Sequence, residues 1–470
     1  MKFKKIMAAA MSAALAIGTL AGCSPSNGKN DSTDKITIKV GGWPSEEGNK
    51  EAYTRMESIK KKFEEKYSDI KVEEDEWGFD LNTFLPKAAS GQLPDVYITS
   101  ITEMKRIIRS GYASNVSKYM KKYKYTDYLR DDILKLISDD KGEIYALPKF
   151  AYSMGLLINL KLFREAGLVK EDGTPQIPET WEQVAQYAQT VKQKTGKAGF
   201  SMATMNNVGG WHFMNIAWAY GVTKEFAKQE NGSWTADFAT PEGTAALQFV
   251  KDLKWKYDAV GENALLDFDE MYKMFATGRT AMMVADPPMN ALIEQYGMKN
   301  SDIAAVSMPA GPAGRFNQIG GELYVMKNGL SDEVIDACFK WLQFNGTTPE
   351  LTDDVKENID SQYKMENEKG YVVGIRKYSM WKSDNIPPVQ KYEDEVRTKY
   401  TNINPKMFTD YENFDKVTPI AEPPVSCQQL YSLLDGCIQN VWTDKNADPE
   451  KLMKDAANNY QVNYLDKEKN

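Results

Sequence analysis

The sequence has only one histidine, His212, among its 470 residues. This scarcity excludes HExxH metalloprotease sites and most zinc ligand sets. A Ser-His-Asp triad could be built only through His212, and no GxSxG motif accompanies it. The phosphate-binding pattern GxxxxGK[ST] is absent as well, which argues against a nucleotide-hydrolysing enzyme. We interpret His212 as a structural residue and expect no metal and no cofactor.

Cysteine is also scarce, with Cys23, Cys338, Cys427 and Cys437 and no CxxC pair. Cys427 and Cys437 fall in one segment of helical pattern, where a rise of ~1.5 Å per residue separates them by ~15 Å, too far for a disulfide. We expect Cys338, Cys427 and Cys437 to be buried thiols. The acidic run at residues 73–76 lacks the spacing of a calcium loop and is typical of a solvated surface.

The chain lacks an excess of positive charge, since 58 Lys and Arg face 66 Asp and Glu for a net charge of −8. An acidic surface argues against nucleic acid as a partner. With 42% hydrophobic and 26% charged residues the composition is that of a folded protein. A chain of this length favours two lobes over one core. We expect a monomer.

Long apolar runs are missing except near the N-terminus. Three lysines precede the apolar stretch Ile6–Leu20, which is shorter than the ~20 residues of a membrane-spanning helix. We therefore predict a signal peptide over residues 1–22. Its ending, Leu20-Ala21-Gly22-Cys23, resembles a bacterial lipobox, in which Cys23 would be lipidated. The alternative is a plain signal peptide followed by an incidental cysteine.

This interpretation places the protein on the extracellular face of the cell membrane, held by a lipid anchor. Residues 23–35 are rich in Ser, Asn, Asp and Lys and predict a flexible tether.

The pattern that follows the tether alternates strands and helices. A strand at 36–40, a helix with apolar residues at helical spacing from 52 to 63 and a strand at 70–72 predict a parallel β-α-β unit. Further strands are predicted at 94–98, 144–148, 156–158, 280–284 and 323–326, and nearly all of the chain beyond 349 is predicted to be helical. Because no long linker separates the lobes, we assign 36–149 and 285–330 to lobe 1, and 150–284 and 331–470 to lobe 2.

Several short motifs, taken in order, resemble those of family 1 extracellular solute-binding proteins, the sugar-binding lipoproteins of ABC importers. The resemblance covers residues 36–345 and is carried by Gly91–Val96, Gly142–Pro148, Gly155–Asn159, Leu162–Leu168, Pro178–Glu182, Phe275–Met282 and Gly320-Gly321. It implies a two-lobed α/β fold of the periplasmic-binding-protein type, with mixed, mainly parallel sheets flanked by helices. It also implies a ligand cleft at a hinge near residues 148–155, a carbohydrate ligand and an ABC permease as membrane partner.

Ligands of open α/β sheets bind beyond the carboxyl ends of strands. The loops after the first and third predicted strands carry Trp43, Ser100 and Glu103. A tryptophan can stack on a sugar ring while polar neighbours bond its hydroxyl groups. Trp211 follows two glycines, as Trp43 does. For each of the two tryptophans the alternative is packing in the core.

Four more residues complete the predicted site. The resemblance to maltodextrin-binding proteins implies a sugar contact for Tyr152. Asp286 and Glu322 follow a strand and a Gly-Gly pair, and their carboxylates could accept hydrogen bonds from adjacent hydroxyls. For these two the alternative is a surface charge. Trp381 could be a third stacking platform or a buried anchor for the helical tail.

We expect a membrane-anchored receptor that captures a carbohydrate, in particular an oligosaccharide, and delivers it to an ABC-type permease. One alternative is a secreted carbohydrate-active enzyme in which Asp286 and Glu322 form a catalytic pair, which would need a separation of ~5–10 Å. Another keeps the receptor and changes the ligand to a peptide, a polyamine or a metal complex.

Overall fold

The computed structural model describes residues 35–468 except Pro288. The predicted signal peptide, Cys23 and the predicted tether as far as residue 34 lie outside the described residues. The strands are β1 (Ile36–Gly41), β2 (Ile70–Asp75), β3 (Val96–Ser100), β4 (Leu147–Ser153), β5 (Gly155–Asn159), β6 (Ala227–Glu230), β7 (Ser233–Ala236), β8 (Met282–Ala285), β9 (Ile303–Val306), β10 (Phe316–Met326) and β11 (Thr418–Ala421).

The helices of the first half of the chain are α1 (Lys50–Lys66), α2 (Leu81–Ala89), α3 (Met104–Arg109), α4 (Ser117–Lys122), α5 (Tyr125–Tyr128), α6 (Asp131–Leu136), α7 (Leu160–Ala166), α8 (Trp181–Thr195) and α9 (Val208–Tyr220). Those of the second half are α10 (Pro241–Trp255), α11 (Phe268–Ala276), α12 (Ala291–Glu294), α13 (Asp332–Phe344), α14 (Asp353–Glu368), α15 (Pro388–Lys399), α16 (Cys427–Thr443) and α17 (Pro449–Asn463). The 3-10 turns used below are η1 (Ile101–Glu103) and η5 (Leu465–Lys467).

The first sheet has the strand order β11-β10-β3-β1-β2, and β4 also pairs with β10. β1 runs parallel to β2 and β3, as the predicted β-α-β unit requires. β10 runs antiparallel to β3 and β4 and parallel to β11. The second sheet, β8-β5-β9, is antiparallel throughout. The sheets are therefore mixed rather than mainly parallel, because β10 enters the first sheet from the direction of the second lobe.

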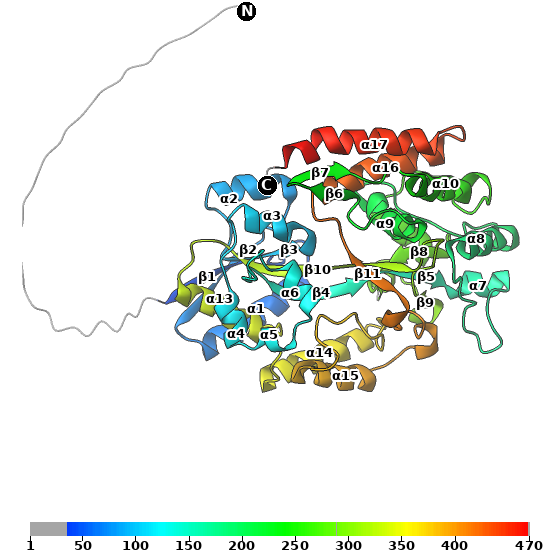
Figure 1. Ribbon diagram of the computed structural model, residues 1–470. Helices are drawn as coiled ribbons and strands as arrows, with labels where there is room; N and C mark the ends of the chain where they lie inside the picture. Colours follow the sequence, from blue (N-terminus) through cyan, green and yellow to red (C-terminus); the bar gives the residue numbers. More distant parts are fainter. Residues whose placement is uncertain (1–34, 288, 469–470) are drawn as a thin grey trace, which may run out of the picture.

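Two lobes lie on either side of three strands, β4, β10 and β11, at the centre of the molecule (Figure 1). β10 pairs with β11 at its start and with β3 at its end, so it runs from the second lobe into the first. β4 leads through Ser153 and Met154 directly into β5 of the second sheet. We refer to β4, β10 and β11 as the crossing strands.

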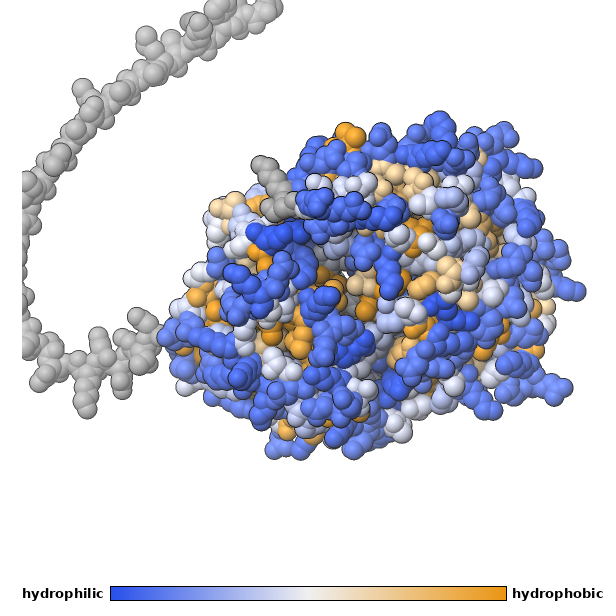
Figure 2. Space-filling model, in the orientation of Figure 1, coloured by the Kyte–Doolittle hydropathy of each residue, from blue (hydrophilic) through white to orange (hydrophobic). Residues whose placement is uncertain are grey.

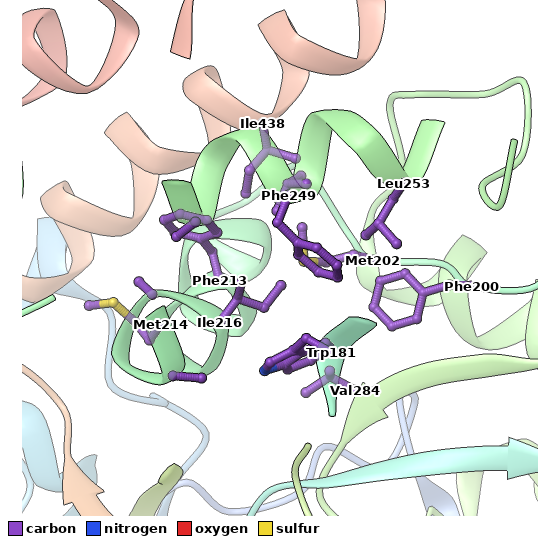
Figure 3. Close-up of a cluster of buried hydrophobic side chains, with 14 of the residues drawn as sticks. Trp181, Phe200, Met202, Phe213, Met214, Ile216, Phe249, Leu253, Val284 and Ile438 are labelled. Atoms are coloured by element: carbon purple, nitrogen blue, oxygen red, sulfur yellow. The ribbon is translucent and has the colours of Figure 1, made fainter. Parts of the chain in front are cut away.

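Each lobe has its own hydrophobic core. The first contains residues between Ile38 and Leu147, together with side chains of β10 and α13. The second contains residues between Met154 and Met308, together with α16 and α17. Figure 3 shows part of the second core, where labelled side chains of α9, α10 and α16 lie above Trp181 of α8 and Val284 of β8.

Several segments pack in a different lobe from the one we expected. Helix α12 was assigned to lobe 1, but its Leu292 is buried in one cluster with Leu157 and Met283 of the second sheet. β9 was assigned to lobe 1 but pairs with β5 in the second sheet. Helix α13 was assigned to lobe 2 but buries Cys338, Phe339 and Trp341 in the first core. The reason is that α13 directly follows β10, which has already carried the chain into the first lobe.

Side-chain caps open two of the helices. The side chains of Thr180 and Ser331 accept hydrogen bonds from backbone N–H groups in the first turns of α8 and α13.

Cys427 and Cys437 lie in the same helix, α16, and both are buried free thiols, as is Cys338. His212 is fully buried in α9, and burial lowers its pKa to about 3, so that it stays neutral. Within residues 35–468 we find no helix long and apolar enough to cross a membrane.

Candidate functional site

One face of the crossing strands and of β3 carries three of the predicted ligand-binding residues, Ser100, Tyr152 and Glu322. Tyr152 stands opposite Gly320, and Glu322 stands opposite both Phe150 of β4 and Ser100 of β3. Because side chains alternate along a strand, residues two apart share a face. We define the cleft face as Ser100, Phe150, Tyr152, Gln318, Gly320 and Glu322 together with Glu422, the residue after β11. Figure 2 shows the surface hollowed between the two lobes.

Aromatic rings stand on this face without being sealed into a core. Phe150 is 40% exposed, and Tyr152 and Trp211 are partly buried. The rings of Tyr152 and Trp211 meet edge to face with their centroids 6.1 Å apart. Gly320 makes room for the phenol, since a Cβ there would lie 2.3 Å from the Tyr152 hydroxyl. Burial, followed by the charges of Glu422 and Asp286, raises the pKa of Tyr152, which keeps its hydroxyl as a hydrogen-bond donor.

Trp211 is held by contacts at the first turn of α9. The Asp435 carboxylate of α16 accepts the backbone N–H groups of Asn207 and Gly210, both at 2.7 Å. Gly210 lets the two helices meet, because a Cβ there would lie 2.2 Å from the Tyr431 carbonyl oxygen. The side-chain amide of Gln318 is oriented so that each donor faces an acceptor. In this orientation its oxygen accepts a hydrogen bond from Trp211 Nε1 at 3.0 Å. The second lobe thus presents a fixed indole to the cleft face.

Carboxyl groups reach the same place from both lobes and from the crossing strands. Glu103 of η1 is buried and has Arg106 at 3.7 Å. Glu422 accepts a hydrogen bond from the Tyr431 hydroxyl at 2.8 Å. Burial raises the pKa of Glu422 to about 7 and that of Asp286 to about 6, and burial also raises the pKa of Glu103. These groups can accept or donate hydrogen bonds, depending on pH.

The remaining polar groups of the cleft face are already paired with neighbours. Glu322 accepts from Lys149 at 2.6 Å, and the β4–β10 register shifts next to this pair. The Ser100 hydroxyl lies 2.7 Å from that of Thr102. A ligand hydroxyl could join either pair without leaving a buried group unsatisfied.

Trp43 does not reach the cleft face, which corrects the prediction for this residue. It is 3% exposed, belongs to the first core and stacks on Trp341 with centroids 5.8 Å apart. The ring face that was expected to meet a sugar is therefore covered by another indole. Gly41 and Gly42 shape a turn here, but the turn directs the ring inward.

Trp381 lies on the opposite side of the crossing strands. It is 7% exposed, belongs to the first core and forms a bridge with Leu129. It lines a groove of about 1010 Å³ together with Ser153 and Ile319, which alternate with Tyr152 and Gly320 and hence face the other way. Its position matches a buried anchor for the tail rather than a platform beside Trp211.

Sequence reasoning missed Glu422, Tyr431 and Gln318. Glu422 follows β11, a strand in a region predicted to be helical, and Pro419 inside that strand obscures its pattern. Proline is tolerated there because β11 is an edge strand. Tyr431 and Gln318 join the site only through pairings between segments far apart in the chain.

A Glu422→Gln variant is expected to be more stable than wild type by about 1–2 kcal/mol at pH 8 and nearly equal to it at pH 4. The folded protein raises the pKa of this carboxyl from 4.5 to about 7, so its stability contribution is present below pH 4.5 and is lost as the pH rises through 7. The whole shift corresponds to about 3 kcal/mol, which we reduce because the residue is partly exposed.

Urea unfolding of both proteins at the two pH values measures this difference. The exposed Glu171→Gln exchange serves as the control and should change nothing. A Glu422→Gln variant less stable than wild type at pH 8 would contradict our interpretation that the partly buried charge of Glu422 destabilises the folded protein.

Comparison with known proteins decides the family. Residues 47–347 match the family model described as bacterial extracellular solute-binding protein. The chain belongs to this family. It is a solute-binding protein and not an enzyme, so the predicted pair of catalytic carboxylates is set aside. Glu73, Glu74 and Asp75 of the acidic run form ion pairs with lysines. The described residues hold no group of three or more His, Cys, Asp or Glu that could bind a metal.

Curated relatives of this solute-binding protein match only part of it. The mannitol-binding protein of Pseudomonas aeruginosa is 28% identical over 163 residues, 34% of this chain and 35% of the relative. The sn-glycerol-3-phosphate-binding periplasmic protein UgpB of Escherichia coli K12 is 26% identical over 221 residues, 44% of this chain and 46% of the relative. The chain thus spans less than half the length of these relatives.

Solved structures match nearly the whole fold. An ABC transporter solute-binding protein of Thermotoga lettingae bound with α-D-tagatose has a TM-score of 0.66 at 23% identity, covering 90% of this chain and 98% of that one. Maltose-bound MalE3 of T. maritima has a TM-score of 0.64 at 17% identity, covering 91% and 99%. These likenesses confirm the two-lobed periplasmic-binding-protein fold.

Proposed function

We propose that this solute-binding protein captures a carbohydrate, in particular an oligosaccharide, and delivers it to an ABC-type permease. The observation that carries the proposal is the cleft face, where the aromatic rings of Phe150, Tyr152 and Trp211 stand among carboxyl, amide and hydroxyl groups. A sugar has an apolar ring face, which an aromatic ring can cover, and a rim of hydroxyl groups, which these polar groups can bond.

The extent of the cleft face favours a ligand of more than one sugar unit. Its members on β10 run from Gln318 to Glu322, about 13 Å along a strand, and Trp211 contacts Gln318 at one end of this row. Ser100 and Glu103 approach from the first lobe, and Trp211 and Asp286 from the second. A ligand touching both sides would stabilise a closed arrangement of the lobes by differential contact.

Calorimetry of the purified protein tests the proposal. The ligands are maltotriose, cellotriose and galactotriose, with a peptide and a polyamine as representatives of other ligand classes. We expect saturable 1:1 binding of at least one trisaccharide and no hydrolysis products. Binding confined to the peptide or the polyamine would contradict a carbohydrate ligand.

Anchoring through Cys23 is part of the same proposal, because a receptor that serves a membrane permease must stay near it. The tether of about eleven residues before the folded body would reach at most ~40 Å. A Cys23→Ala variant should move the protein from the membrane fraction to the medium or periplasm, and wild type should carry a lipid detectable by mass spectrometry. An unmodified cysteine in membrane-free wild-type protein would contradict the anchor.

A further inference from the structure

The carboxyl groups of the cleft carry more charge than the cations beside them can neutralise. Glu422 has Tyr431 as its hydrogen-bond partner, with Trp211 also in reach, and Glu103 acts on it as a like charge. Asp286 at the edge of the second lobe is influenced chiefly by burial. Within the part of the chain that the structure describes, no lysine or arginine forms an ion pair with Glu422 or Asp286.

The groups around Glu422 can be named element by element. Tyr431 and Cys427 face it from α16, Tyr152 from β4 and Glu103 from η1. Two arginines of α3 pair with other carboxylates. Arg106 lies 3.7 Å from Glu103, and Arg109 lies 3.8 Å from Glu468, which also accepts from Ser426. Glu422 therefore presents a negative charge to a ligand when it is ionised and no charge when it is protonated.

We infer that Glu422 is a specificity-determining residue, which acts with Glu103 to make the cleft reject anionic solutes and accept uncharged carbohydrates. The inference rests on the proposed function and adds to it the charge of the ligand. An anionic group placed beside Glu422 would meet a like charge in a partly dry site, where such contacts cost most. An uncharged sugar can instead donate its hydroxyls to the same oxygens.

The inference separates this protein from one relative by chemistry. UgpB is named for sn-glycerol 3-phosphate, whose phosphate would need cationic or backbone N–H partners. The ammonium group of Lys149 lies beside the cleft face, and Glu322 already binds it. A phosphorylated solute would therefore have to displace an ion pair and also approach Glu422.

The test compares each neutral trisaccharide of the calorimetry panel with the same trisaccharide oxidised at C6 to the uronate, with sn-glycerol 3-phosphate alongside. Wild type, Glu422→Gln and the control Glu171→Gln are titrated at pH 8 and pH 5.5. Uronates stay ionised at both pH values, whereas Glu422 has a pKa of about 7 and loses its charge at pH 5.5.

For wild type at pH 8 we expect the uronate to bind about tenfold more weakly than its neutral parent. We call the affinity for the neutral sugar divided by that for its uronate the discrimination ratio. Glu422→Gln should reduce the discrimination ratio severalfold. At pH 5.5 the discrimination ratio of wild type should fall toward that of the variant. Glu171→Gln should behave as wild type throughout. If Glu422→Gln does not fold, the pH dependence of wild type is compared with that of Asp286→Asn, because burial raises the pKa of Asp286 to about 6 and this carboxyl also loses its charge at pH 5.5. A pH dependence that persists in Asp286→Asn supports Glu422, and one that disappears there contradicts the inference.

Two outcomes overturn the inference. One is a uronate or sn-glycerol 3-phosphate that binds wild type as tightly as the neutral sugars. The other is a discrimination ratio that is the same for wild type at both pH values, or the same for Glu422→Gln as for wild type. If neutral trisaccharides bind without charge discrimination, only the inference fails. If no carbohydrate binds at all, the proposed function fails and the inference with it.

Discussion

Replacing Trp211 by alanine is expected to weaken carbohydrate binding by about 5- to 150-fold. A fully stacked ring contributes about 1–3 kcal/mol, a range taken from base stacking on aromatic side chains, and each 1.4 kcal/mol is tenfold in affinity. Trp211 is partly exposed beside Tyr152, and Gln318 and Asp435 hold the indole and its helix in place. The indole should therefore lose little conformational freedom when a ligand binds.

Calorimetry of the variant with the tightest-binding trisaccharide measures this effect. Trp255→Ala is the matched control, because Trp255 is an equally large, partly exposed indole on α10, bonded to the Val441 carbonyl. The control should bind as wild type does. Equal affinity of wild type and Trp211→Ala would remove Trp211 from the site.

Replacing Trp43 by alanine is expected to lower the free energy of unfolding by about 3–5 kcal/mol, the usual cost of deleting a large aromatic side chain from a core. Its ring stacks on Trp341, which in turn meets Phe63 edge to face. The cavity would open beneath β1 and α13, away from the cleft face. The affinity of the folded variant for carbohydrate should stay within about twofold of wild type.

Chemical unfolding gives the stability of Trp43→Ala, and calorimetry below its transition gives the affinity. The more conservative Trp43→Phe keeps most of the ring contact and secures a folded protein for the binding measurement. A large loss of affinity in Trp43→Phe, with stability unchanged, would place Trp43 at the ligand after all.

Two tryptophans with the same sequence signal thus have different surroundings. Both Trp43 and Trp211 follow two glycines, and both were predicted to stack on a sugar. What separates them is the tertiary partner. Trp43 meets Trp341, which β10 and α13 bring into the first core, whereas Trp211 meets Tyr152 and stays partly exposed. No local pattern reports which large residue from elsewhere in the chain will cover a ring.

The regular part of the fold was accessible from the sequence because its signals are local. The strands β1 and β5 follow the predicted strand pattern. The two-lobed architecture was predicted from the chain length and from the family resemblance that the ordered motifs carry. The resemblance to maltodextrin-binding proteins indicated Tyr152, and the Gly-Gly pair of β10 indicated Glu322; the structure places both residues on one face. Whether these residues contact a ligand stays a prediction.

The lobe assignment of α13 and the strand β11 could not be read in the same way. Both depend on where β10 carries the chain, and β10 pairs with strands from three distant segments. A short edge strand containing Pro419 has almost no signal of its own. Glu422, on which the inferred charge selectivity depends, follows that strand.

A crystal structure of the protein with its tightest-binding trisaccharide tests the central claim most directly. We predict a sugar on the cleft face, with one ring against Trp211 and hydroxyl groups within hydrogen-bond distance of Glu103, Tyr152 or Glu422. A sugar bound instead in the groove on the opposite side of the crossing strands, beside Trp381 and Ser153, would contradict the account.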